Sequence, residues 1–119
     1  IYDPSKRYFL SILSYYETGD LKQINSFADI LNKKMSDKNI DLTIVLLPYE
    51  YQTRTCEDKN LLPQYKILKK FQNLKINLID YTKKFCESEY PKNLFYKFDP
   101  MHLSEKGHYL VFELIKNEI

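Results

Sequence analysis

Two short segments, a continuous apolar run at residues 42–47 and a second buried-strand pattern at residues 76–81, constrain the fold of this chain more than any other feature of its sequence. The first, Leu-Thr-Ile-Val-Leu-Leu, is rich in β-branched residues, which is typical of a strand buried on both faces of a parallel sheet. A helical pattern at residues 62–71 separates the two segments. Because strand–helix–strand alternation indicates a right-handed crossover between parallel strands, the sequence predicts an α/β fold.

Apolar residues recur at helical spacing in four segments of the chain. Pro4 suits a first helical turn, Asp20 stands three residues before Gln23 as in a capping box, and Ser104 suits an N-cap. We expect helices at residues 4–16, 20–35, 62–71 and after Ser104, loops at residues 49–60 and around Cys86 and Pro91, and a short aromatic segment at residues 94–98.

A parallel sheet of only two strands leaves backbone groups unpaired at its edges, so we expect further strands from a segment outside these residues. The chain opens on Ile1, with neither an initiating Met nor a recognisable signal peptide, which indicates a processed, cleaved or truncated product. Residues 1–119 are therefore predicted to form a single, partial domain.

The charge and the hydropathy of the sequence predict neither nucleic-acid binding nor a membrane-spanning segment. The net charge is only +2 and the lysines are scattered, so the sequence does not predict nucleic-acid binding. The longest apolar run, at residues 42–48, is far shorter than the roughly 20 residues of a transmembrane helix, so no transmembrane segment is predicted in this chain.

An acid and an imidazole stand three residues apart in the stretch Asp-Pro-Met-His, between the aromatic segment and the last predicted helix. A carboxylate that orients a nearby imidazole, and stabilises it once protonated, makes up two thirds of a hydrolytic triad. His102 is the candidate general base and Asp99 is the candidate orienting acid. Alternatively, Asp99 is a turn residue before Pro100 and His102 is an ordinary loop histidine.

The run from Asp99 to His108 fits the pattern D-x-x-H-L-x-x-x-G-H and resembles the last sequence block of the SGNH (GDSL-type) hydrolase and esterase superfamily. The resemblance implies a three-layer, flavodoxin-like parallel sheet, of which this chain is the C-terminal half. It also implies a serine-type esterase or acyltransferase that acts on O-acyl groups, above all O-acetyl groups, of a carbohydrate or lipid. The family mechanism passes through a serine acyl-enzyme and requires no cofactor.

The nucleophile block of that family is missing from these residues. None of the serines follows a predicted strand in a Gly-flanked turn, and no Gly-Asp-Ser or Gly-x-Asn-Asp sequence is present. We therefore expect the N-terminal half of the domain to come from the same polypeptide or from a partner chain. Without it, we expect no esterase activity, because base and acid alone cannot form or stabilise a tetrahedral intermediate.

Four polar and aromatic residues, Tyr49, Glu50, Tyr51 and Gln52, follow Pro48 at the end of the first predicted strand. Ligands of open α/β sheets bind in the crevice at the carboxyl ends of the strands. These four residues are therefore candidates for a sugar-binding cleft. The alternative is a polar surface loop with one buried tyrosine.

Three further residues of the last block are assigned structural roles. Ser104 fits the N-cap of the last helix, Gly107 allows that helix to approach the sheet closely, and His108 is expected to pack or hydrogen-bond near the site. Asp99, His102 and His108 are all metal-ligand types, so a metal-dependent hydrolase is an alternative, although no metal is predicted.

The two cysteines, Cys56 and Cys86, lie in the loops that follow the two predicted strands. Because the carboxyl ends of parallel strands meet at one edge of a sheet, a disulfide between them is geometrically reasonable. A disulfide indicates an extracytoplasmic location, either periplasmic or secreted. The alternative is a pair of reduced thiols in a cytosolic protein.

A rival function of a different class remains open. In that interpretation the chain is a non-catalytic α/β binding or assembly module, and the Asp-x-x-His block is a relic.

Overall fold

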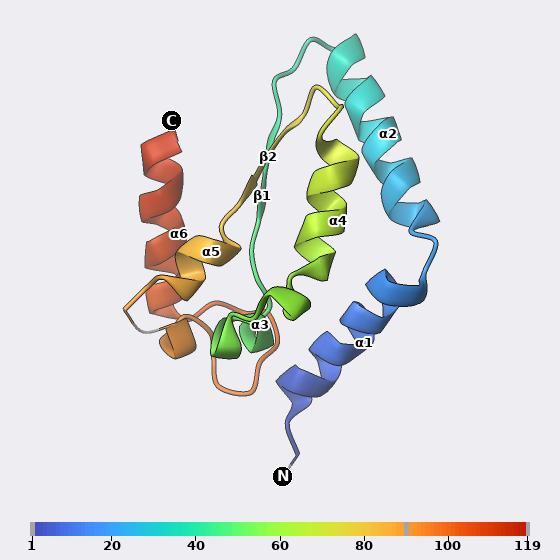
Figure 1. Cartoon of the computed structure of the whole chain (residues 1–119). Coiled ribbons are helices and arrows are strands. Elements are labelled where there is room, and N and C mark those ends of the chain that lie inside the picture. The colour runs from blue at the N-terminus through green and yellow to red at the C-terminus, as the bar shows by residue number, and fades with distance from the viewer. Residues whose placement is uncertain (1, 90, 119) are drawn as a thin grey trace.

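A computed structural model of the chain describes residues 2–89 and 91–118 (Figure 1). None of the helices in this part of the chain combines the length and the apolar character needed to cross a bilayer. In chain order the elements are α1 (Pro4–Thr18), α2 (Lys22–Asp37), β1 (Thr43–Leu46), α3 (Glu50–Thr55), the 3₁₀ helix η1 (Asp58–Asn60), α4 (Leu62–Phe71), β2 (Asn77–Asp80), α5 (Thr82–Cys86), the 3₁₀ helix η2 (Pro91–Asn93) and α6 (Glu105–Glu118).

The two strands pair in parallel, in a register that places Thr43 opposite Asn77 and Leu46 opposite Asp80. Both predicted strands and the α/β class are thus confirmed, although each strand is four residues long and shorter than the predicted segment that contains it. The strands are only half-buried, because the described sheet has no third strand beside them.

Alternate strand residues point to two separate hydrophobic cores, as the period of a β-strand requires. Val45 and Ile79 face one core, which α5, the segment before α6, and α6 itself complete. Ile44 and Leu78 face the other core, which α2 and α4 cover. Figure 1 shows α6 on one side of the sheet and α4 with α2 on the other. The inward residues of α6 are Leu110, Val111 and Leu114, whereas Ile115 is exposed.

Both stretches predicted as loops contain a short helix. Residues 49–60 include α3, because the Tyr49 backbone N–H donates to Gln52 Oε1 at 2.8 Å and starts the helix. The second stretch contains α5, whose first residue, Thr82, donates hydrogen bonds from its backbone and its hydroxyl to Asp80 Oδ1 at the end of β2. The loop predictions were therefore wrong in both places.

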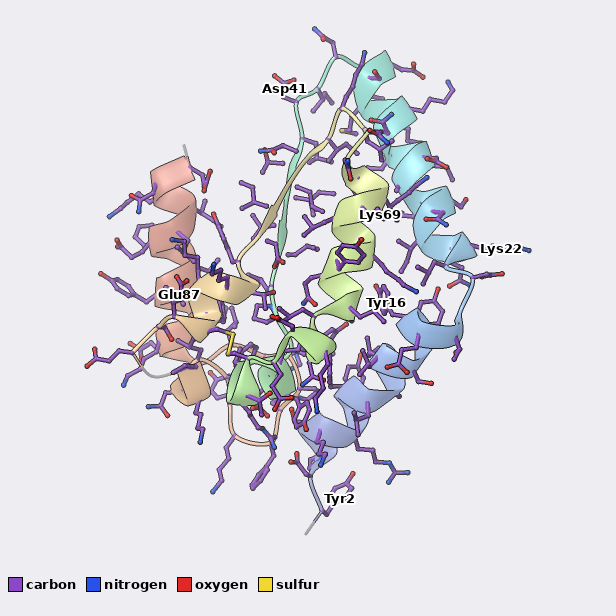
Figure 2. The ribbon with its side chains drawn as sticks, viewed as in Figure 1. Tyr2, Tyr16, Lys22, Asp41, Lys69 and Glu87 are labelled. Carbon is purple, nitrogen blue, oxygen red and sulfur yellow. A yellow bond between two sulfur atoms is a disulfide. The ribbon has the colours of Figure 1, made fainter. Side chains whose placement is uncertain are left out.

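A disulfide between Cys56 and Cys86 joins α5 to the C-terminal end of α3 (Figure 2). Their Cα atoms are 5.9 Å apart, and the bond closes a loop with a sequence separation of 30 residues. The predicted pairing is confirmed. In the chain-entropy model a loop of this size stabilises the fold by roughly 3–4 kcal/mol.

The chain exposes more surface than a folded monomer of its mass. Its accessible area is 8360 Å², whereas the scaling for monomers gives about 6,800 Å² for 14.4 kDa. Its radius of gyration is 15.3 Å against an expected value of about 13.5 Å. Exposed large apolar residues contribute to this surface, among them Phe27 on α2.

Gly107, in the first turn of α6, lies against the backbone of Leu94. A Cβ at position 107 would stand 2.0 Å from the Leu94 carbonyl oxygen. The close neighbour is therefore the segment that leads into the Asp99 loop, rather than the sheet as the sequence analysis expected.

Substituting Gly107→Ala should destabilise the fold by about 1–3 kcal/mol, because the clash with a backbone carbonyl outweighs the gain in helix propensity. Urea unfolding followed by circular dichroism measures the change. Asn117→Ala, at an exposed position of the same helix, is the matched control and should change stability by no more than about 0.5 kcal/mol. A Gly107→Ala protein as stable as the wild type would contradict this packing.

Candidate active site

Asp99 and His102 form a close pair on the loop before α6. Both carboxylate oxygens of Asp99 lie 2.9 Å from His102 Nδ1. The His102 side chain is 72% exposed, whereas that of Asp99 is only 30% exposed. The ring is therefore held at one nitrogen and open to solvent on its other side, which is the arrangement a general base requires.

The backbone holds the Asp99 carboxylate in place. Its Oδ1 atom accepts the N–H groups of Met101 at 3.0 Å and of His102 at 2.8 Å. These two bonds, followed by the bond from the imidazole, keep the pKa of Asp99 below its ordinary value, although partial burial opposes them. The carboxylate thus stays ionised, as needed to stabilise an imidazolium ion.

This geometry combines features of both sequence-based interpretations. Asp99 orients the imidazole of His102, as in a catalytic triad, and it also accepts local backbone amides, as a turn aspartate does. The two roles are compatible because a carboxylate has about four acceptor sites.

The loop that carries the pair is closed at its base. An isolated antiparallel bridge joins Phe95 to Leu103, with Tyr96 N–H donating to the His102 carbonyl at 3.1 Å. Below it, Ser104 N–H donates to the carbonyl of Leu94 at 2.9 Å. The Ser104 hydroxyl donates to the Asn93 carbonyl and accepts from the Gly107 N–H, so it serves both the loop and the start of α6.

One hydrogen bond places this loop at the carboxyl edge of the sheet. The N–H of Glu50, the first residue of α3, donates to the carbonyl of Pro100 at 2.8 Å. Since α3 follows β1 after only three residues, the pair lies at the edge where ligands of open α/β sheets bind.

The four residues proposed for a sugar-binding cleft are largely committed to packing. Tyr49 is half-buried beside Tyr8 and Phe9, and Tyr51 packs on Phe9. Gln52 is fully buried, and its amide nitrogen donates to the Asn60 carbonyl and to Gln64 Oε1, both at 2.7 Å. Gln52 is thus not available to line an open cleft.

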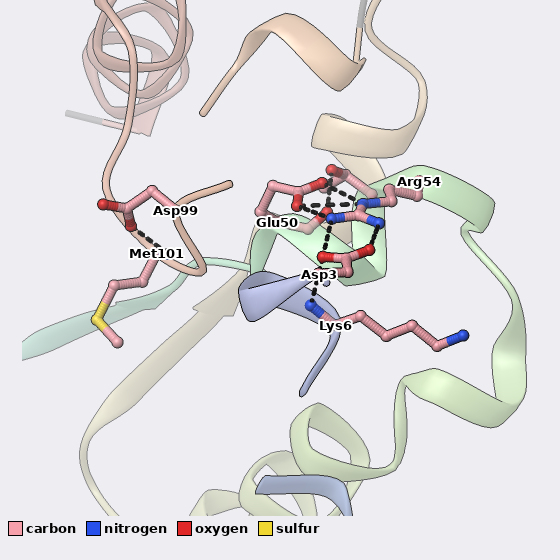
Figure 3. Close-up of polar contacts among 7 residues, drawn as sticks. Asp3, Lys6, Glu50, Arg54, Asp99 and Met101 are labelled. Atoms are coloured by element: carbon pink, nitrogen blue, oxygen red, sulfur yellow. Dashed lines mark hydrogen bonds and ion pairs between the residues drawn. The ribbon is translucent and has the colours of Figure 1, made fainter. Parts of the chain in front are cut away.

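Glu50, the remaining member of this set, belongs to an ion-pair network that the sequence analysis missed (Figure 3). The Arg54 guanidinium donates to Glu50 through Nε at 2.8 Å, and to Asp3 Oδ1 through Nη2 at 2.9 Å. A second bond, from Arg54 Nη1, reaches Asp3 Oδ2. The network ties the start of α1 to α3. The spacing of four residues between Glu50 and Arg54 could have predicted an ion pair between them, but nothing in the sequence indicated that Asp3 would join it.

His108 is exposed on α6 rather than packed near the pair. Within residues 2–89 and 91–118, no three His, Cys, Asp or Glu side chains gather closely enough to hold a metal ion. The metal-dependent alternative, which needs Asp99, His102 and His108 together, thus gains no support from the geometry.

No family model matches the chain, and neither does any curated protein or solved structure. The Asp99–His102 geometry and its surroundings are therefore the observations that bear on function.

The Arg54 network predicts a specific acid response. Hydrogen bonds from Arg54, and next from the Lys6 N–H, lower the pKa of Asp3 to about 2. A carboxyl group whose pKa is depressed in the folded state stabilises the fold above its unfolded pKa of about 3.9, and this contribution disappears as the pH falls towards 2. The free energy of unfolding should thus fall more steeply between about pH 4 and pH 2 in the wild type than in Asp3→Asn.

Urea unfolding at a series of pH values checks this. Asp41→Asn, at an exposed position before β1, is the matched control and should keep the wild-type slope. Equal slopes for the wild type and Asp3→Asn would show that the ion pair does not form in solution.

Proposed function

We propose that this chain is the C-terminal half of an SGNH-like serine esterase or acyltransferase domain and supplies the base and the orienting acid. The observation that carries the proposal is the pairing of Asp99 with His102 Nδ1, on a closed loop at the carboxyl edge of a parallel sheet. The proposed substrate is an O-acyl ester, above all an O-acetyl ester, of a carbohydrate or lipid.

In the proposed reaction, His102 Nε2 accepts the proton of a serine hydroxyl while the serine oxygen attacks the acyl carbon. The imidazolium then gives this proton to the departing alcohol oxygen, and an acyl-enzyme remains. Water, or an acceptor alcohol in a transferase, repeats the sequence in the second half-reaction. Asp99 keeps its charge throughout and stabilises the imidazolium.

The serine is proposed to come from outside this chain. Ser104, two residues from His102, has its hydroxyl engaged with the Asn93 carbonyl. Ser5 is fully buried in α1. The remaining serines have no Gly-flanked turn after a strand.

The open edge of β1 is the proposed docking site for the segment that brings this serine. Central strands of parallel sheets are almost wholly apolar, whereas edge strands carry polar residues. β1 is apolar from Ile44 to Leu46, whereas β2 carries Asn77 and Asp80. The excess surface, about 1,500 Å² relative to a monomer of this mass, exceeds the roughly 800 Å² per partner of a standard interface.

The disulfide supports an extracytoplasmic location for the complete domain, either periplasmic or secreted. Reducing compartments do not maintain structural disulfides in most proteins.

The test is hydrolysis of 4-nitrophenyl acetate by this chain together with the segment that completes its sheet. His102→Ala should lower kcat at least about a thousandfold, and Asp99→Asn should lower it by a smaller factor because the imidazole remains. His108→Ala is the matched control and should keep the wild-type rate. Residues 1–119 alone should not exceed a buffer control.

Two outcomes would contradict the proposal. Wild-type turnover in the His102→Ala domain would remove His102 from the chemistry and favour the non-catalytic binding module. Turnover by residues 1–119 alone, abolished by His102→Ala, would show that the nucleophile lies within this chain.

A further inference from the structure

A strained aromatic residue stands next to the Asp99–His102 pair. Phe98 adopts a φ of 63°, in the left-handed region, and the residue is 53% exposed. A bulky side chain at positive φ is an outlier, and strained residues that persist gather at ligand-binding and active sites. Burial does not account for the strain at Phe98, because the residue is exposed.

The same loop presents a second exposed ring. Tyr96 is 60% exposed and lies two residues before Phe98. The N–H of Asp99 donates to the Tyr96 carbonyl at 3.1 Å, so a tight turn fixes the backbone that carries both rings. These rings are thus presented to solvent by an ordered loop rather than by a free end.

Both rings line a cavity of about 710 Å³ between α3, η2 and the start of α6. This volume lies within the roughly 300–1,000 Å³ range of small-molecule sites. Asp99 and His102 do not line the cavity. The cavity is therefore separate from the candidate active site, and residues 96–99 connect the two.

The polar lining of the cavity favours an anionic ligand that carries hydroxyl groups. The carboxylates of Asp3 and Glu50 line the cavity and share the single positive charge of Arg54, so these three groups together carry one negative charge. Across the whole lining, four basic and three acidic side chains leave a formal charge of +1. Lys92 and Lys97 are exposed at its border, and Lys97 Nζ lies 5.1 Å from the centre of the Phe98 ring. Glu105 and Lys106, at the start of α6, add one charge of each sign.

We propose that this cavity binds an acidic oligosaccharide. Tyr96 and Phe98 stack on the apolar face of a sugar ring, and Lys92 and Lys97 pair with its carboxylates. Asn93, another residue of the lining, adds an amide group that suits the hydroxyl groups of a sugar. This binding does not depend on the proposed esterase activity. If that activity holds, the site identifies an acidic glycan as the carrier of the acyl group.

Calorimetric titration of the intact, disulfide-bonded chain with trigalacturonate tests the proposal, with neutral maltotriose and AMP as comparison probes. Trigalacturonate should bind saturably, and maltotriose at least tenfold more weakly. Lys92→Ala and Lys97→Ala should each raise Kd several-fold. Phe98→Asn, which tolerates positive φ, should raise it at least tenfold through loss of the ring. Circular dichroism confirms that each variant is folded.

The matched controls are Lys69→Ala on α4 and Phe112→Ala on α6, both exposed and outside the cavity lining, and both should keep the wild-type Kd. Equal affinity for maltotriose, preference for AMP, no binding of trigalacturonate, or an equal loss in the controls would each overturn the proposal. Because the titration involves no turnover, its result is separate from that of the esterase test.

Discussion

Parallel pairing of β1 with β2 is the constraint on which the rest of the structure depends. Alternate side chains of both strands, such as those of Ile44 and Val45, point into two separate hydrophobic cores, and helices cover both faces of the sheet. The pairing also brings the carboxyl ends of both strands to one edge, where α3 and α5 begin and the disulfide joins them. The Asp99 loop reaches that edge through the hydrogen bond between Glu50 and Pro100. The position of the candidate site thus follows from the sheet.

The sequence predicted the features that depend on local pattern. The two strands, the helix at residues 62–71 and the cysteine pairing were confirmed. It did not predict α3 and α5, because helices of six and five residues depend on tertiary partners rather than on propensity. Gln52 starts α3 while its amide bonds to Gln64 on α4. Arg54 pairs with Asp3 across a sequence separation of 51 residues, and a periodic pattern of residues does not predict a contact between positions so far apart.

In the candidate site, the same groups have both structural and chemical roles. The Asp99 carboxylate holds its own turn through the Met101 and His102 amides, and the same oxygens orient the imidazole. Gly107 lets α6 start against the base of this loop. The Asp-x-x-His spacing was readable from the sequence, whereas the conformation of Phe98 was not, because nothing in its neighbours demands a positive φ.

The imidazole tautomer of His102 tests the central claim most directly. With the ring in its neutral form, ¹⁵N–¹H correlation spectra distinguish a proton on Nδ1 from one on Nε2. A carboxylate can only accept, so Asp99 should hold the proton on Nδ1 and leave the Nε2 lone pair available, and Asp99→Asn should remove this preference. The exposed ring of His108 is the internal reference. A proton on Nε2 of His102, as in a ring without this partner, would contradict the account.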